Sequence, residues 1–226
     1  GFMLEIGSFD NEVFSLSAVE TKFIDPQHCK LLELACTTLF ADICNSRGAA
    51  RDTNECLCNA VHQNTFESTS VAVGISGTEY AQIVATSTSA EGPSPYMAIG
   101  GFMSVACGRI SFAFGWHGPS FCVDTACSSA LVAVHITCND LKSHSNCACD
   151  GLMHSTRALC AGANITLLPT TTAMFSVAGM LAWDGRCKTL DSTANGYVRA
   201  EVVVTCMLNR HARSITELGC NQNRGS

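Results

Sequence analysis

Hydrophobic and polar positions follow two different periods along this chain. Behind Asp25 and Pro26, apolar side chains recur at steps of three and four through residue 43, which predicts a helix with Asp25 as its N-cap. Short continuous apolar runs, which are typical of buried strands, recur along the rest of the chain. They lie at residues 71–77, 120–124, 159–168 and 198–208.

Helical patterns separate the predicted strands. They cover residues 77–86, 97–114 and 128–141, whereas residues 47–70 are polar, show no period and are predicted to be mostly loop. Apolar strands that alternate with helices indicate a layered α/β fold. The sequence contains no internal repeat, no G-x-G-x-x-G and no phosphate-binding loop, so we expect no nucleotide cofactor.

Composition narrows the choice of function. Hydrophobic residues make up 47% of the 226 residues and charged residues only 14%, against roughly 25% charged in an ordinary soluble domain. This balance favours a buried layer or a subunit interface. A net charge of -6 without a cluster of Lys or Arg argues against a nucleic-acid partner. Because no apolar run approaches the roughly 18 residues of a spanning helix, we expect no membrane span.

The chain carries 15 cysteines, an odd number, and no signal segment opens it. We therefore interpret the cysteines as mostly reduced thiols and expect a cytoplasmic protein. Location in an organelle stays an alternative. The first residue is not Met, and we interpret the N-terminus, with any targeting signal, as missing. We expect no metal site, and structural zinc is the alternative for two clusters whose spacing is C-x-C rather than C-x-x-C. The clusters are Cys56, Cys58 and His62, and His144, Cys147, Cys149 and His154.

The stretch GPSFCVDTACSSALVAVH, residues 118–135, places Cys127 between a predicted strand and a predicted helix. Asp124 or Thr125 can cap that helix, which puts Cys127 in its first turn. Unpaired amides and the helix dipole favour a thiolate there, and the same amides can hold an oxyanion. Small neighbours leave room for a bulky thioester, although a buried structural cysteine in a tight turn fits these features equally well. The expected apolar face of the helix consists of Leu131, Val134, Cys138 and Leu141.

The motif VDTACSSALVAVH resembles the active-site motif of the β-ketoacyl synthases, the ketosynthase domains of polyketide and fatty acid synthases, which usually reads D-T-A-C-S-S-S. Further segments resemble the family in the same order, and together they cover most of the chain. These segments are FDNEVFSLS, DPQHCKLLELA, YMAIGGFMSVACGRISFAFGWHGPS, GMLAWDGRCKTLDSTANGYVRAE and the terminal CNQNRGS.

The resemblance implies a thiolase-like layered α/β fold, present here only as its incomplete N-terminal portion. Residues 1–226 would be one partial ketosynthase domain with an inserted loop around 139–158. The implied activity is that of an acyltransferase of the 3-oxoacyl synthase type, with Cys127 as nucleophile. An acyl group would reach Cys127 from the phosphopantetheine of an acyl carrier protein, and a malonyl-type extender would be decarboxylated and condense with it. The implied assembly is a homodimer with no directly bound cofactor.

In the family two histidines assist decarboxylation, in motifs that read H-G-T-G-T and N-I-G-H. Neither motif occurs in this sequence, so we expect the chain by itself not to complete the condensation. His135 lies two turns beyond Cys127, about 12 Å along the helix axis, and is expected to pack in the core. His117 would reach Cys127 only if the chain folded back. The remaining histidines, expected in solvent, are His28, His62, His144, His154 and His211.

Two other functions stay open at this point. A cysteine hydrolase would pair Cys127 with a histidine, whereas a non-catalytic ketosynthase-like subunit would only bind or pair. A histidine nitrogen within about 3.5 Å of the Cys127 sulfur would favour the hydrolase. We expect none.

Some positions depart from the family pattern. Ala130 stands where the family has a third serine, and Asn195 replaces an aspartate. Ala200 and Val202 replace both glycines of G-E-G, and glycine serves close backbone approach or a positive φ. The charged residues that match family positions are expected to form structural ion pairs. They are Arg109, Asp184, Arg186, Lys188, Asp191 and Arg199.

Overall fold

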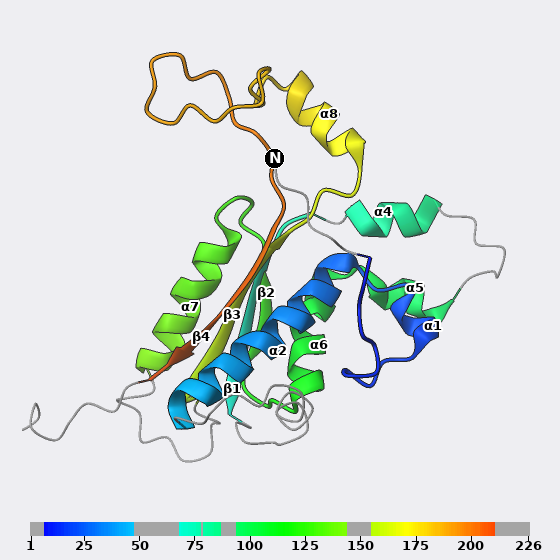
Figure 1. Ribbon diagram of the computed structural model, residues 1–226, viewed down its shortest axis with the longest axis vertical. Coiled ribbons are helices and arrows are strands. Elements are labelled where there is room, and N and C mark those ends of the chain that lie inside the picture. The colour runs from blue at the N-terminus through cyan, green and yellow to red at the C-terminus, as the bar shows by residue number, and fades with distance from the viewer. Residues whose placement is uncertain (1–6, 48–67, 78, 87–93, 144–154, 211–226) are drawn as a thin grey trace, which may run out of the picture.

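The computed structural model describes residues 7–47, 68–77, 79–86, 94–143 and 155–210, and Figure 1 shows how their helices and strands are arranged. The strands are β1 (Thr69–Ile75), β2 (Ser120–Val123), β3 (Arg157–Asn164) and β4 (Val202–Asn209). The helices are α1 (Ala18–Thr21), α2 (Pro26–Arg47), α4 (Glu79–Thr86), α5 (Pro95–Gly100), α6 (Met103–Phe114), α7 (Ser129–Ser143) and α8 (Pro169–Val177).

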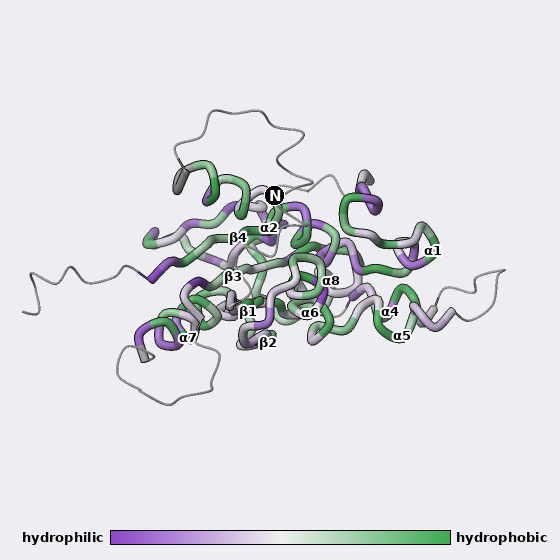
Figure 2. Tube along the Cα trace, turned by 90° about the horizontal axis from the view of Figure 1, so that it is seen from below, coloured by the Kyte–Doolittle hydropathy of each residue, from purple (hydrophilic) through white to green (hydrophobic). Residues whose placement is uncertain are grey.

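The strands form a single sheet in the order β2-β1-β3-β4. β1 runs parallel to β2 and β3, whereas β4 is antiparallel to β3. Figure 2 looks nearly along the strands and shows α7 on one side of the sheet, with α2 and α6 on the other. The predicted layered α/β fold is therefore confirmed.

Large apolar side chains fill the layer between the sheet and the helices α2 and α6. Successive strand residues point to opposite faces, and every second residue of β1 from Val71 to Ile75 belongs to this layer. Leu31 and Leu39 of α2 and Ile110 of α6 join them, and all six residues are buried. This layer is the main hydrophobic core of the described residues.

Small residues build the opposite face of the sheet. Gly74 of β1 and Gly162 of β3 lie under α7, where a Cβ added to either would overlap Ala130. The contact is close enough that Ala133 and Thr137 of α7 are completely buried. Ala130 therefore occupies the place where α7 and the sheet leave least room for a side chain.

The predicted apolar face of α7 is wrong in part. Leu141 is buried as expected, but Leu131 is 74% exposed, and Val134 and Cys138 are only partly buried. Because the helix packs on glycines, its small side chains face the sheet and its larger apolar ones lie to the side. The spacing of large apolar residues therefore predicts the wrong buried face for a helix whose contact with the sheet consists of small residues.

The predicted helix at 97–114 is two helices, α5 and α6. The Gly100 carbonyl accepts the Asp25 N–H at 2.9 Å instead of continuing the helix, and the chain is extended at Phe102 before α6 begins. The predicted role of Asp25 as the N-cap of α2 is confirmed, because its Oδ1 accepts the Gln27 N–H at 2.8 Å. The same residue thus starts α2 and ends α5.

Other boundaries shift by a few residues. β1 begins at Thr69, two residues before the predicted strand, and β4 begins at Val202. α7 continues to Ser143, inside the predicted inserted loop. Residues 48–67 and 144–154, which include both cysteine and histidine clusters, lie outside the described residues.

Two absences hold for the described part of the chain. No group of three or more His, Cys, Asp or Glu side chains there is arranged to hold a metal ion. Among the helices of this part, none combines the length and the apolar character needed to cross a membrane.

We expect Gly74→Ala to destabilise the chain by about 1–3 kcal/mol, because the added methyl group overpacks the contact between β1 and α7. Gly108→Ala in α6 is the matched control: a Cβ there meets nothing within 4 Å, and alanine is the better helix former. Urea unfolding followed by circular dichroism compares the midpoints. Equal midpoints for Gly74→Ala and the unchanged chain would contradict the close contact.

Candidate active site

Cys127 lies at the edge of the sheet where the parallel strands end. β1, β2 and β3 are parallel, so their carboxyl ends share one edge, which is where open α/β sheets bind ligands. Cys127 occupies the short connection between the end of β2 at Val123 and the start of α7 at Ser129. The predicted place between strand and helix is confirmed. Its predicted place in the first helical turn is wrong, because α7 begins two residues after Cys127.

The connection is a tight turn held by short polar side chains. Asp124 Oδ1 accepts the Ala126 N–H at 3.0 Å, so Asp124 stabilises the turn rather than capping the helix. The Ser129 hydroxyl accepts the Thr125 N–H at 2.9 Å and donates to the Ala126 carbonyl at 2.6 Å. Ala126 adopts a φ of 55°, in the left-handed region that residues with a Cβ rarely enter. The backbone is therefore strained directly before Cys127, and Ser129 holds it in place.

The Cys127 side chain is exposed, and neither its sulfur nor its backbone N–H makes a hydrogen bond within the described part of the chain. The expected lack of a histidine partner is confirmed for the described histidines. His117 is exposed. His135 is exposed too, with its Nε2 3.0 Å from Asn139 Nδ2, so the prediction that it packs in the core is wrong. It lies on a different side of α7 from the small residues that face the sheet.

His28 is buried, which corrects the expectation of a solvated side chain. It is 1% exposed, and neither ring nitrogen has a hydrogen-bond partner among the described residues. Burial, helped by the positive charge of Arg109, lowers the pKa of His28 from 6.5 to about 3. Its polar neighbours Asp25 and Gln27 are buried as well, which is why the local pattern indicated solvent. The other histidines expected in solvent, His62, His144, His154 and His211, lie outside the described residues.

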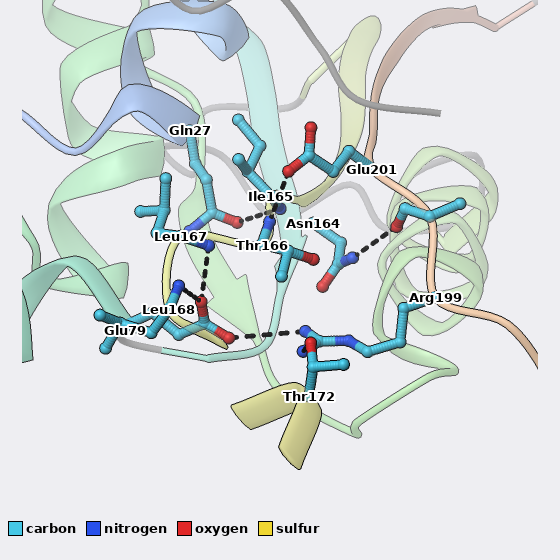
Figure 3. A network of polar contacts seen from close by, with 11 residues as sticks. Gln27, Glu79, Asn164, Ile165, Thr166, Leu167, Leu168, Thr172, Arg199 and Glu201 are labelled. Carbon is cyan, nitrogen blue, oxygen red and sulfur yellow. Dashed lines mark hydrogen bonds and ion pairs between the residues drawn. The ribbon is translucent and has the colours of Figure 1, made fainter. Parts of the chain in front are cut away.

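Glu79 organises the same edge of the sheet where the chain leaves β3 (Figure 3). Its carboxylate accepts the N–H groups of Leu167 and Leu168, both at 2.7 Å, and lies 3.5 Å from the Arg199 guanidinium. Burial alone would raise the pKa of Glu79, but these hydrogen bonds and Arg199 hold it below its usual value. Arg199 also donates to Thr172 Oγ1 at 2.9 Å, so the network ties the end of β3 to α8.

Two further contacts in Figure 3 fasten the same segment. Glu201 accepts the Thr166 N–H at 3.0 Å, and Gln27 Oε1 accepts the Ile165 N–H at 3.3 Å. Sequence analysis missed these acceptors. No spacing along the chain distinguishes a carboxylate that binds buried backbone amides from one in solvent.

Some of the charged residues expected to form ion pairs do so. The pairs are Arg109 with Glu20 at 2.6 Å, Lys188 with Asp184 at 2.8 Å and Arg199 with Glu79 at 3.5 Å. Asp191 instead accepts the Thr193 N–H at 2.8 Å, and Arg186 forms no ion pair with a described residue. These charges brace loops and helices rather than surround Cys127.

The family profile described as Beta-ketoacyl synthase, N-terminal domain, matches residues 1–214. The chain belongs to the β-ketoacyl synthase family. The polyketide synthase component of lovastatin nonaketide synthase from Aspergillus terreus is 35% identical over 213 residues. A mycocerosic acid synthase-like polyketide synthase from Mycolicibacterium smegmatis is 36% identical over 209 residues. The matches cover 94% and 92% of this chain but only 6% and 9% of those relatives.

Solved ketosynthase structures share the fold. An oxazolomycin ketosynthase domain of Streptomyces albus matches with a TM-score of 0.70 and 26% identity, over 96% of this chain and 33% of that chain. The module 6 ketosynthase of the bacillaene synthase from Bacillus subtilis gives the same TM-score and identity, over 92% of this chain and 30% of its own. The predicted thiolase-like fold is confirmed, and this chain spans about a third of a solved ketosynthase.

The departures from the ketosynthase pattern fit the backbone of this chain. Neither Ala200 nor Val202 has a positive φ, and the Ala200 carbonyl accepts a hydrogen bond from Asn164 Nδ2 at 2.9 Å. Asn195 Oδ1 accepts from Lys188 Nζ at 3.0 Å, a contact that an aspartate would also make. In this chain, the backbone at residues 200 and 202 therefore does not require glycine, and the contact at residue 195 does not require an aspartate.

We expect the free energy of unfolding to fall as the pH drops below about 6.5, because of His28. The unfolded histidine takes up a proton near its ordinary pKa of 6.5, whereas the folded one does so only near 3, so protonation favours the unfolded chain. The stability is unaffected above that range and has dropped by about 2 kcal/mol at pH 5. Urea unfolding at neutral and acid pH measures the loss.

His28→Gln should flatten this pH dependence, since it removes the titrating ring. His135→Ala is the matched control, because His135 is exposed and its loss should leave the dependence unchanged. An equally steep loss in His28→Gln would show that another group takes up the proton.

Proposed function

We propose that this chain is the nucleophile-bearing part of a ketosynthase, in which Cys127 accepts acyl groups from the phosphopantetheine arm of an acyl carrier protein. The observation that carries the proposal is the exposed Cys127 thiol, presented by a strained turn between β2 and α7. Strained strand-to-helix turns hold nucleophiles clear of the sheet in other α/β enzymes. Family membership and the polyketide synthase relatives support a carrier-bound thioester as the substrate.

Acyl transfer is a thioester exchange. The Cys127 thiolate attacks the thioester carbonyl, a tetrahedral oxyanion forms, and the phosphopantetheine sulfur leaves and takes up the proton that Cys127 has lost. The Cys127 N–H has no partner among the described residues, so it is free to donate to that oxyanion. The positive end of α7, which begins two residues later, favours the same negative charge.

Condensation is the second half of the proposed reaction. A malonyl-type extender loses carbon dioxide, and its carbanion attacks the Cys127 thioester, forming a carbon-carbon bond and releasing the cysteine. Negative charge on the carbanion needs a positioned donor. In the family histidines of two motifs supply it, and neither motif occurs in these 226 residues.

A homodimer is the assembly that we propose. β2 is an edge strand: it pairs with β1, and no described strand covers its other side. Unpaired strand edges are ready templates for a second chain. The neighbouring α6 carries Phe112, which is 85% exposed and supports an apolar contact beside that edge.

Incubation with an acyl pantetheine thioester should add an acyl group to Cys127, because this thiol is exposed and unpaired on its turn. Peptide mass mapping locates the added mass. Cys127→Ala should lose it, whereas Cys187→Ala, which removes another exposed thiol, should keep it. Equal acylation of Cys127→Ala would refute the assignment, and no acylation of any chain would favour the non-catalytic ketosynthase-like subunit.

The 226-residue chain should release no carbon dioxide from a malonyl carrier protein above the Cys127→Ala background. The reason is that the sequence contains neither of the two motifs whose histidines stabilise the carbanion in the family. Radiolabelled malonyl groups and an acyl donor make the assay sensitive. Clear turnover would mean that residues within this chain suffice for decarboxylation.

A further inference from the structure

Two cysteines face each other across the antiparallel strands of the sheet. Cys160 of β3 and Cys206 of β4 are direct register partners, a relation that sets Cα atoms roughly 4.5–5.5 Å apart. A disulfide needs Cα atoms roughly 4.4–6.8 Å apart. The pair therefore has the spacing of a disulfide, although both thiols are free.

Both side chains lie on the face of the sheet that α7 covers. Thr137 Oγ1 of α7 is 2.9 Å from the Cys160 sulfur, and Gly162, two residues along β3, lies under Ala130. Register partners of an antiparallel pair project to the same face. Cys206 therefore lies beside Cys160, and no reversal of a strand is needed to join the two sulfurs.

The two thiols differ in a way that gives them different chemical roles. Cys160 is 1% exposed, whereas Cys206 is exposed. The neighbouring Cys160 thiol lowers the pKa of Cys206 to about 7, and the same pairing, together with burial, raises the pKa of Cys160. Near neutral pH, a large fraction of Cys206 is therefore ionised and within reach of solvent, and a protonated thiol lies beside it.

We propose that Cys206 and Cys160 form an oxidation site, at which a peroxide attacks Cys206 and Cys160 then closes a disulfide between β4 and β3. The site lies apart from the connection that carries Cys127, so it goes beyond the acyl transfer proposed above.

The chemistry needs only hydrogen peroxide as the oxidant. The Cys206 thiolate attacks a peroxide oxygen, the O–O bond breaks, and hydroxide leaves and is protonated to water, which converts Cys206 to a sulfenic acid. The Cys160 sulfur then attacks the Cys206 sulfur, the S–O bond breaks, and the oxygen leaves as water with the Cys160 proton. In total two thiols and a peroxide give a disulfide and two waters, and two electrons pass from the sulfurs to the peroxide.

The other described cysteines lack this combination of features. The neighbouring Cys122 thiol lowers the pKa of Cys107 to about 6, but Cys107 is only 4% exposed, which shields it from peroxide. Cys187 is exposed, but no hydrogen bond joins it to another described cysteine. Cys138 on α7 is close enough to Cys160 for their charges to interact, so it is the rival partner.

Oxidation of the full 226-residue chain with hydrogen peroxide tests the site. Free thiols are then blocked, the chain is digested without reductant, and crosslinked peptides are identified by mass spectrometry. We expect a Cys160–Cys206 peptide as the main crosslink within the chain, lost on treatment with dithiothreitol. A main crosslink of either residue to Cys138, or crosslinks between chains only, would overturn the proposal.

Variants separate the two roles. Cys206→Ser should abolish the crosslink and the sulfenic acid, whereas Cys160→Ala should abolish the crosslink but leave a sulfenic acid at Cys206 that dimedone traps. Cys187→Ser is the matched control for an exposed thiol and should form the crosslink normally. Absence of both the crosslink and the dimedone adduct in chains with unchanged circular dichroism would also overturn the proposal.

Discussion

The close contact between α7 and the sheet is the constraint on which the site depends. Gly74 and Gly162 admit Ala130 where no further atom fits, so the helix has one depth at which it can pack. β2 lies at the edge of the same sheet. From the end of β2, the chain must leave the plane of the sheet and reach the start of α7 within a few residues. The left-handed conformation of Ala126 makes this short connection possible, and it leaves the Cys127 side chain exposed.

A second set of contacts, centred on the charge of Glu79, supports the edge of the sheet where the parallel strands end. The carboxylate of Glu79 is taken from water but receives two backbone N–H groups and the Arg199 guanidinium. A buried carboxylate without such partners would be costly, so these groups belong together as a unit. The unit joins segments far apart in sequence, and it holds α8 and the chain after β3 near the edge where Cys127 lies.

Sequence reasoning succeeded where short-range signals decide the structure. The cap and proline that begin α2, the apolar strands and the cysteine between β2 and α7 all follow from neighbouring residues. It failed where distant partners decide. The face of α7 depends on glycines in two strands, which no helical period records. His28 is polar in a polar stretch, yet the folded chain buries it, close enough to Arg109 for that charge to lower its pKa. Glu79 accepts hydrogen bonds from amides almost ninety residues later in the chain.

The order of the strands in the sheet has a consequence for folding. β3 lies between β1 and β4, and α7 rests on both β1 and β3, although β3 follows α7 in the chain. Contacts between segments far apart in sequence form late, because the loop between them must close first. During synthesis from the N-terminus, Cys127 emerges before the strand that supports its helix exists. Cys127 can therefore acquire the strained turn of the folded chain only after residues 157–164 have been made and have paired with β1 beneath α7.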